Sequence, residues 1–184
     1  MSDPNYVYTV QKKIAGSSIL YLFISEGKRN IIKAIEYSYV QELMDKRLYN
    51  LAFGDFDFDS WSLLDDPISG NGDHYKVFNT VLQSIPDFFA VYPDALLMVR
   101  GRDSNPEFIQ ECRLNCKKKC PEGQCKNSHR RITIYRNYVN MNFSDLKEEY
   151  LFYGGRQNAH NHPIIEIYRK NEKYDSVFLS KKEV

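Results

Sequence analysis

The cysteines of this chain are the residues whose type and spacing indicate one particular chemistry, metal ligation. All four lie within one short stretch, at Cys112, Cys116, Cys120 and Cys125. The first three are spaced four residues apart, so they would line one stripe of a helix. A proline and a glycine then allow the chain to reverse and bring Cys125 back to the others. Zinc prefers four thiolate or imidazole ligands in a tetrahedron, so this stretch predicts a zinc site.

His129 lies four residues beyond Cys125 and is a fifth candidate ligand. Two ligand sets are therefore open: all four cysteines, or three cysteines with His129. The same spacing also fits small apolar side chains on the buried face of a helix, or thiols that form reversible disulfides. A complete set of protein ligands leaves no position for water, so a bound zinc ion would be structural rather than catalytic. No organic cofactor is expected.

Basic residues surround the cysteines, and two interpretations of them stay open. They are Lys117, Lys118, Lys119, Lys126, Arg130 and Arg131. Nearby positive charge lowers the pKa of a thiol, whereas the same side chains could contact phosphates. The formal net charge of the whole chain is only +1, which argues against a globally basic nucleic-acid binder. Any nucleic-acid function would therefore depend on this local patch.

Two further candidate sites bind by charge. The turn Arg100-Gly101-Arg102 follows a predicted buried strand, and its backbone N–H groups and guanidiniums could hold a phosphate or carboxylate. An acidic loop predicted at residues 56–73 and its flanks supply the carboxylates Asp55, Asp66 and Asp73, which could hold a divalent cation. The alternative for this loop is a solvated segment in which Asp and Gly residues form turns.

The hydrophobic pattern predicts an α+β fold in a single compact domain, residues 1–184. An N-terminal antiparallel β-meander comes first, then a helix–strand–helix unit, then C-terminal strands. The meander is predicted at 6–11, 18–25, 30–39 and 47–53, the helix–strand–helix unit at 73–91, 95–99 and 105–119, and the last strands at 150–153, 164–168 and 174–179. Residues 132–139 indicate a short helix, with a strand as the competing prediction. The cysteine-rich residues 104–129 are predicted to be an insertion within this domain.

The N-terminal residues show no basic region followed by an apolar run, so no signal peptide is expected. The most apolar stretch, residues 19–24, is too short to span a bilayer. We therefore expect a soluble cytoplasmic protein without membrane contact. In a reducing cytoplasm, clustered cysteines favour metal ligation or free thiols over a disulfide framework.

The order of several motifs resembles that of an uncharacterised bacterial family, a domain of unknown function. The motifs are Phe23-Ile-Ser-Glu-Gly-Lys28, Asn50-Leu-Ala-Phe-Gly-Asp55, Asn71-Gly-Asp73 and Arg131-Ile-Thr-Ile-Tyr135-Arg136. The resemblance implies a bacterial, intracellular, compact α+β domain, and it brings no established activity. The matching positions that would line a shared site are Gly54, Asp55, Asn71, Gly72, Asp73, Lys76, Gly101 and Arg131. In that family a short stretch joins the glycine at 101 to the Arg131 helix, so the resemblance implies that the cysteines belong to residues added in this member.

Two functional hypotheses follow. The first is a non-enzymatic interaction module that binds a protein or nucleic-acid partner through the basic cysteine stretch and the Arg100/Arg102 turn. The second is a metal-dependent enzyme acting on a nucleotide or phosphorylated substrate, with Asp55, Asp66 and Asp73 on the metal and Arg100 and Arg131 on the phosphate. The sequence predicts neither the substrate, the partner nor the oligomeric state.

Overall fold

The N-terminal strands pair as an antiparallel meander. The computed structural model describes residues 6–64, 70–104, 106–116, 118, 120–121, 125–157 and 162–182. Contacts along the chain group it into two compact units, Met1–Ala95 (unit 1) and Leu96–Val184 (unit 2). Each unit is described by itself.

Among its described residues, unit 1 has five strands, and each strand pairs antiparallel with the next. They are β1 (Gln11–Ala15), β2 (Ser18–Glu26), β3 (Asn30–Leu43), β4 (Lys46–Asp57) and β5 (Ser62–Leu64). The long β3–β4 hairpin turns at Met44 and Asp45, whose φ values of 54° and 57° are both left-handed. A pair of positive φ values matches the right-handed twist of the strands, so this two-residue turn needs no glycine.

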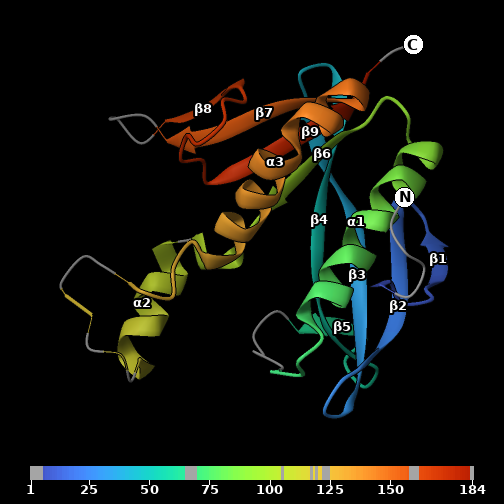
Figure 1. Cartoon of the computed structure of the whole chain (residues 1–184), viewed down its shortest axis with the longest axis vertical. Coiled ribbons are helices and arrows are strands. Elements are labelled where there is room, and N and C mark those ends of the chain that lie inside the picture. Colours follow the sequence, from blue (N-terminus) through green and yellow to red (C-terminus); the bar gives the residue numbers. More distant parts are fainter. Residues whose placement is uncertain are drawn as a thin grey trace. The chain divides into compact units, whose positions relative to one another are not determined.

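The helix α1 (His74–Val91) covers one face of the meander (Figure 1). Its contacts with the strands are largely aromatic: Tyr37 stacks on Phe88 at 4.5 Å between ring centroids, and Tyr49 meets Phe88 edge-on at 5.2 Å. Tyr37 also shares a 2.6 Å hydrogen bond with Ser84, so its hydroxyl is satisfied inside the core. Pro86 lies inside this one helix and does not divide it in two, because the residues after it stay packed on the sheet.

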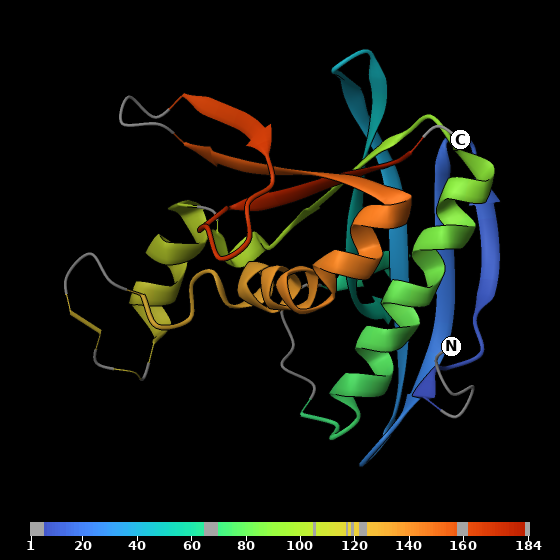
Figure 2. The ribbon, with the colours of Figure 1, turned by 45° about the horizontal axis from the view of Figure 1, so that its top comes forward.

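The part of unit 2 that the structure describes holds four antiparallel strands and two α-helices. The strands lie in the order β6 (Leu96–Arg100), β9 (Ser176–Lys181), β7 (Tyr150–Gln157) and β8 (Pro163–Ile167). The 20-residue helix α3 (Arg130–Glu149) contacts β6, β7 and β9. A short 3-10 turn, η2 (Arg102–Ser104), leads into α2 (Pro106–Asn115), which lies beyond the start of α3 and away from the strands (Figures 1 and 2).

The predicted fold class is confirmed, including the N-terminal meander, the helix–strand–helix order and the C-terminal strands. Several local predictions were wrong. The first strand is Gln11–Ala15 rather than 6–11, because the turn at Gly16 pairs these residues with β2. The acidic loop is shorter than predicted, since β4 continues to Asp57 and β5 follows it. Helix α2 ends at Asn115 rather than near residue 119.

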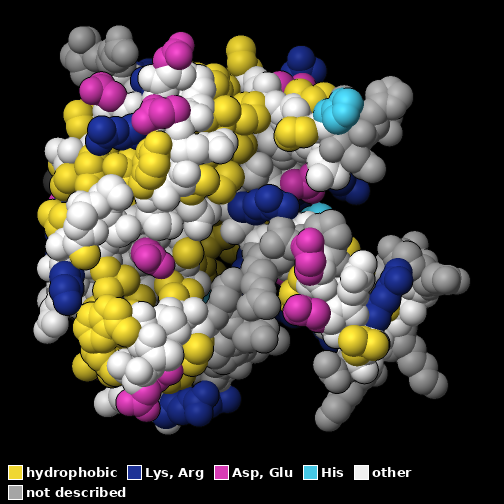
Figure 3. All heavy atoms as spheres, turned by 180° about the vertical axis from the view of Figure 1, so that it is seen from behind, with side chains coloured by type: hydrophobic (Ala, Val, Ile, Leu, Met, Phe, Trp, Pro, Cys, Tyr) yellow, Lys and Arg dark blue, Asp and Glu magenta, His cyan; other side chains and the backbone are white. Residues whose placement is uncertain are grey.

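The face of the meander opposite α1 is visible in Figure 3, where apolar side chains lie between well-separated Lys and Arg side chains. Exposed apolar residues of unit 1 include Ile24 and Ile32, which face each other across β2 and β3. Within the described residues, no helix combines the length and apolar character needed to cross a membrane.

Candidate functional site

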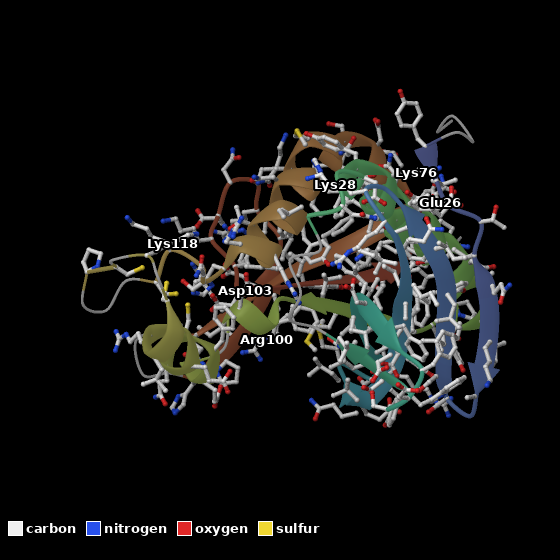
Figure 4. The ribbon with its side chains drawn as sticks, turned by 90° about the horizontal axis from the view of Figure 1, so that it is seen from below. Glu26, Lys28, Lys76, Arg100, Asp103 and Lys118 are labelled. Atoms are coloured by element: carbon white, nitrogen blue, oxygen red, sulfur yellow. The ribbon has the colours of Figure 1, made fainter. Side chains whose placement is uncertain are left out.

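The four cysteines, spread over 14 residues of sequence, lie near one another. Cys112 is close enough to Cys125 and Cys116 for these thiols to affect its pKa, and Cys120 affects the pKa of Cys116 in the same way. The neighbouring thiols therefore follow the order Cys125, Cys112, Cys116 and Cys120. All four are free thiols and all are partly exposed. Figure 4 shows sulfur atoms gathered beside Lys118, between α2 and α3.

Nitrogen donors point at three of the four sulfurs. The side-chain amide of Asn127 donates to Cys112 Sγ at 3.3 Å and to Cys116 Sγ at 3.6 Å. The backbone N–H of Lys126 donates to Cys120 Sγ at 3.5 Å. Lys118 Nζ in turn holds Asn127 by a 2.7 Å bond to its Oδ1. A thiol is a weak acceptor whereas a thiolate is a good one, so this donor set suits ionised sulfur.

Two of the thiols have perturbed pKa values of opposite sign. At Cys112 the Asn127 amide favours the thiolate, but partial burial and the hydrogen bonds with Cys125 and Cys116 raise the pKa above its ordinary value. At Cys116 the backbone hydrogen bond from Lys118 lowers the pKa. Neighbouring thiols influence each other's protonation, so the two pKa shifts are properties of the cysteine cluster as a whole and not of independent thiols.

The sulfurs are near one another without being arranged as a finished metal site. In the described part of the chain, no group of three or more His, Cys, Asp and Glu side chains is arranged to hold a metal ion. His129, the alternative ligand, takes a left-handed conformation at the start of α3, and its Nδ1 lies 3.7 Å from Asp175 Oδ1. The imidazole ring of His129 therefore neighbours a carboxylate, whereas each cysteine neighbours other cysteines.

The helix that carries the first two of these cysteines has little packing of its own. Among the side chains of α2 that the structure describes, residues 107–114, none is fully buried. Leu114 is 84% exposed. An isolated helix shorter than about 12 residues is marginal in water. The ten residues of α2 therefore need stabilisation that the apolar core of unit 2 does not provide.

The C-terminal end of the cysteine segment, defined here as residues 106–129, is tied to Asp103, which lies just before the segment in the sequence. The backbone carbonyl of Asp103 accepts from His129 N at 3.0 Å, and its Oδ2 accepts from Arg131 N at 2.9 Å. The segment thus begins and ends near Asp103. This geometry is what an insertion requires, although the insertion itself stays a prediction.

Asp103 lies beside the predicted anion site at Arg100-Gly101-Arg102. The residue is only 6% exposed, and its carboxylate lies at the N-terminus of α3, where the helix dipole favours negative charge. A Cβ on Gly101 would lie 2.3 Å from Asp103 Oδ1, so the glycine permits this approach. Arg100 is exposed, and the side chain of Arg102 lies outside the described part. Burial lowers the pKa of Arg131. Anion binding at this turn stays a prediction.

The predicted residues of unit 1 meet at the start of α1, in what we call the Asp73 network (Tyr8, Ser25, Asn71 and Asp73). Asp73 Oδ2 accepts from Tyr8 Oη at 2.7 Å and from Ser25 Oγ at 2.5 Å. Burial opposes ionisation of Asp73, but these hydrogen bonds and the charge of Lys33 outweigh it and lower the pKa. Asp73 stands at the N-cap position of α1 but does not cap the helix with its side chain.

Asn71 fastens the β2–β3 turn to this network. Its Nδ2 donates to Ser25 Oγ at 2.8 Å and to Arg29 O at 2.9 Å, and its Oδ1 accepts from Arg29 N at 3.0 Å. A Cβ at Gly27 would lie 2.0 Å from Asn71 O, so only glycine allows this approach. Gly72 has a φ of +89°, a conformation that favours glycine.

Asp55 and Lys76, the other predicted residues of unit 1, also have partners there. Asp55 Oδ1 lies 2.5 Å from Lys33 Nζ, in an ion pair whose side chains are 14% and 7% exposed. Lys76 Nζ stands 4.2 Å from the centre of the Tyr8 ring. In Figure 4, Lys76 lies at the same end of unit 1 as Glu26 and Lys28. The carboxylates of Asp55 and Asp73 are therefore already engaged by cationic and hydroxyl groups.

These partners bear on the enzyme hypothesis. A metal ion at Asp55 would have to displace the Lys33 ammonium, and at Asp73 it would compete with two hydroxyl donors. Asp66 lies outside the described residues, and Arg100 and Arg131 belong to unit 2. Asp57, also in the acidic stretch, accepts from Ser60 and from the N–H of Asp59, as the turn interpretation predicted.

Unit 2 also contains an open groove of about 440 Å³ that the sequence did not indicate. It lies between the end of α3 and strands β7 and β8. Its apolar lining includes Phe143, Leu151 and Ile167, with Lys147 and Lys182 among the polar side chains. None of the predicted site residues lines it.

No match was found among curated proteins or among solved structures. A match of another kind covers more than half of the chain. It includes the Asp73 network and the Gly101 turn. Residues 3–107 match DUF6934, a family of unknown function, and the chain belongs to this family.

Proposed function

We propose that this protein is a non-enzymatic interaction module in which one zinc ion, held by the four cysteine thiolates, folds the cysteine segment into a partner-binding surface. The proximity of Cys112, Cys116, Cys120 and Cys125 carries the proposal. A zinc ion placed among them would be held by four Zn–S bonds of about 2.3 Å.

The exposure of the cysteines and of α2 supports a metal over the alternatives. Free cysteines that act as small apolar residues are mostly buried, whereas all four of these are partly exposed. Helix α2 has no fully buried side chain among those described, so the segment lacks an apolar core of its own. Structural zinc supplies folding free energy to segments of this kind.

The surroundings of the sulfurs support four cysteines rather than three with His129. Asn127 and Lys126 direct N–H groups at the sulfurs, as donors next to ligating atoms do in metal sites. His129 Nδ1 instead neighbours Asp175. Four protein ligands leave no open position for water or substrate, which is why the proposed zinc is structural.

Binding would release the protons of the four thiols to solvent, so affinity should rise with pH. Thiolate ligands require a reducing compartment, which agrees with the expected cytoplasmic location. The four cysteines follow the residues that match the family. The proposed metal site is therefore argued for this chain alone.

The test is the metal content of the purified, untagged protein, measured by elemental mass spectrometry. We expect one zinc per chain in the natural sequence and loss of zinc in the double variant Cys120→Ser/Cys125→Ser. Leu114→Ser is the matched control, because Leu114 lies between the cysteines and is 84% exposed. His129→Gln should retain zinc if the ligands are the four cysteines.

Absence of zinc, together with four titratable free thiols, would contradict the proposal. Equal zinc in the double cysteine variant and the Leu114→Ser control would contradict it as well, because the metal would then be bound elsewhere. Loss of zinc in His129→Gln would replace the four-cysteine ligand set by three cysteines and His129.

A further inference from the structure

The charge of this chain is strongly segregated. Residues 112–131 contain seven Lys and Arg and one acidic residue, so this stretch carries +6 although the whole chain carries +1. The remainder of the chain therefore carries a net charge of −5. Local concentration of positive charge in an otherwise acidic chain is typical of a surface that binds a polyanion.

Four of these cations form what we call the basic face: Arg113, Lys118, Lys126 and Arg130. All four are exposed. Among the described residues, Arg113, Lys126 and Arg130 make no ion pair and no side-chain hydrogen bond, and Lys118 bonds only the neutral Asn127. In the part of the chain that the structure describes, no carboxylate therefore neutralises these charges.

A bound zinc ion would neutralise only part of this charge. Four thiolates and one Zn²⁺ carry a combined charge of −2, so the stretch would retain +4. The lysines closest to the sulfurs can balance the negative charge of the metal centre, but they do not account for all the positive charge of the stretch. The remaining positive charge is available to an external anion.

The composition of the segment favours nucleic acid over an acidic protein. The centre of a protein–protein interface is depleted of charge and enriched in aromatic side chains. Here Leu114 is the one large apolar side chain that is strongly exposed among the described residues of the segment; the segment contains no Tyr or Trp, and its one Phe, Phe108, is half-buried. A protein–DNA interface, in contrast, is polar and strongly positive.

We infer that the basic face binds the phosphate backbone of nucleic acid without reading its sequence. The inference rests on the proposed zinc-bound segment, because the metal would hold Arg113 on α2 close to Lys126 and Arg130. Phosphate contacts fix position and carry no sequence information. The segment has no exposed aromatic side chain among its described residues on which a base could stack.

The test is fluorescence anisotropy with a short fluorescein-labelled duplex DNA and with its labelled single strand, using protein of measured zinc content. The variant Arg113→Gln/Lys126→Gln/Arg130→Gln removes three cations that have no partner in the described structure. The control Lys28→Gln/Lys170→Gln/Lys173→Gln removes the same charge from exposed positions elsewhere. Raising the salt from about 50 to 200 mM separates phosphate contacts from other binding.

Each phosphate contact contributes about 0.9 to the slope of log K against log salt. If three phosphates are contacted, raising the salt across that range should therefore weaken binding by about 40-fold. The affinity of the basic-face variant should no longer depend on salt in this way. The control variant should retain it. Randomising the DNA sequence should leave the affinity unchanged, and polyglutamate should compete far less well than unlabelled DNA.

Equal losses in the two triple variants would overturn the inference, because binding would then follow net charge alone. Competition by polyglutamate as strong as that by DNA would replace nucleic acid by an acidic protein. A zinc-loaded protein that fails to bind either DNA would refute this inference while leaving the proposed zinc site intact. Absence of zinc would instead refute the proposed function, whatever the DNA result.

Discussion

Replacing Lys33 with methionine will strongly destabilise unit 1. Lys33 Nζ lies 2.5 Å from Asp55 Oδ1, and the two side chains are only 7% and 14% exposed. The charge of Lys33 also favours the ionised form of Asp73. The substitution therefore leaves two carboxylates without the cation that they share, in a place that water barely reaches.

The structure sets the size of the effect. At the observed separation and an effective dielectric constant of about 20, the attraction within the pair is about 6–7 kcal/mol before desolvation is subtracted. Removing one partner of a buried pair typically costs about 3–5 kcal/mol. We expect Lys33→Met to fall in that range. Asp55→Asn should cost only about 2 kcal/mol, because Lys33 then keeps Asp73 and can still donate a hydrogen bond.

The assay is equilibrium urea unfolding followed by the fluorescence of Trp61. This residue is the only tryptophan of the chain and lies between β4 and β5, so the signal reports on unit 1. With a slope of about 2 kcal/mol per molar urea, Lys33→Met should lower the midpoint by about 2 M. The double variant Lys33→Met/Asp55→Leu should recover most of the loss, since an apolar pair can replace a buried ion pair.

Lys12→Met is the matched control, because Lys12 also pairs with an aspartate, Asp87, but the two side chains are 30% and 51% exposed. Its cost should stay below about 1 kcal/mol, as for other exposed pairs. The reasoning is refuted if Lys33→Met costs no more than this control. It is equally refuted if the losses of Lys33→Met and Asp55→Leu simply add in the double variant.

Three further predictions concern other parts of the fold. The pKa of Asp73 is lowered in the folded state, so its ionised form stabilises unit 1 above the unfolded pKa of about 3.9, and this stabilisation is lost as the pH falls. In Asp73→Asn the unfolding free energy should therefore decline less steeply below about pH 4. An unchanged decline would contradict this. Gly154→Ala would place a Cβ 2.2 Å from the Tyr174 ring, so the variant should lose about 1–3 kcal/mol of unfolding free energy. Its melting temperature, measured by circular dichroism, should fall. An unchanged melting temperature would show that the ring can move aside. Asp103→Ala removes the acceptor at the start of α3 and should cost about 1–2 kcal/mol, with faster hydrogen exchange at the Arg131 amide, whereas normal protection there would contradict the cap.

The sequence predicted the order of most elements because their hydrophobic pattern is local. The helix at α1 and the strands β2, β6, β7, β8 and β9 were found at or near their positions. The β3–β4 hairpin was predicted too short because its turn, Met44-Asp45, contains neither glycine nor asparagine. The register of this hairpin depends on pairing between distant residues, which a local pattern does not reveal.

The candidate sites were predicted in part. Asp55, Asn71, Asp73 and Lys76 gather in unit 1, but their partners Tyr8, Ser25 and Lys33 were missed. One signal for Lys33 was present, since it shares a strand face with Ile35 and Tyr37, and a lysine on an apolar face requires a buried partner. Tyr8 was assigned to a strand, whereas its N–H donates to Thr80 Oγ1 and its hydroxyl to Asp73.

Anion binding by the Arg100-Gly101-Arg102 turn stays a prediction, and the adjacent carboxylate of Asp103 was overlooked. A carboxylate three residues after Arg100 can reach the start of α3 only because residues 104–129 return to the same point. That closure is a long-range feature without a local sequence signal. The cysteines, in contrast, were found by spacing alone, and Asn127 is the neighbour that spacing did not indicate.

The central claim, one zinc ion on four cysteines, is tested most directly by X-ray absorption at the zinc edge of the purified protein. The account predicts four sulfur neighbours at about 2.3 Å and no nitrogen or oxygen in the first coordination sphere. Three sulfurs with one nitrogen at about 2.0 Å would assign His129 as the fourth ligand. A sample without zinc, or with zinc bound mainly to oxygen and nitrogen, would contradict the claim.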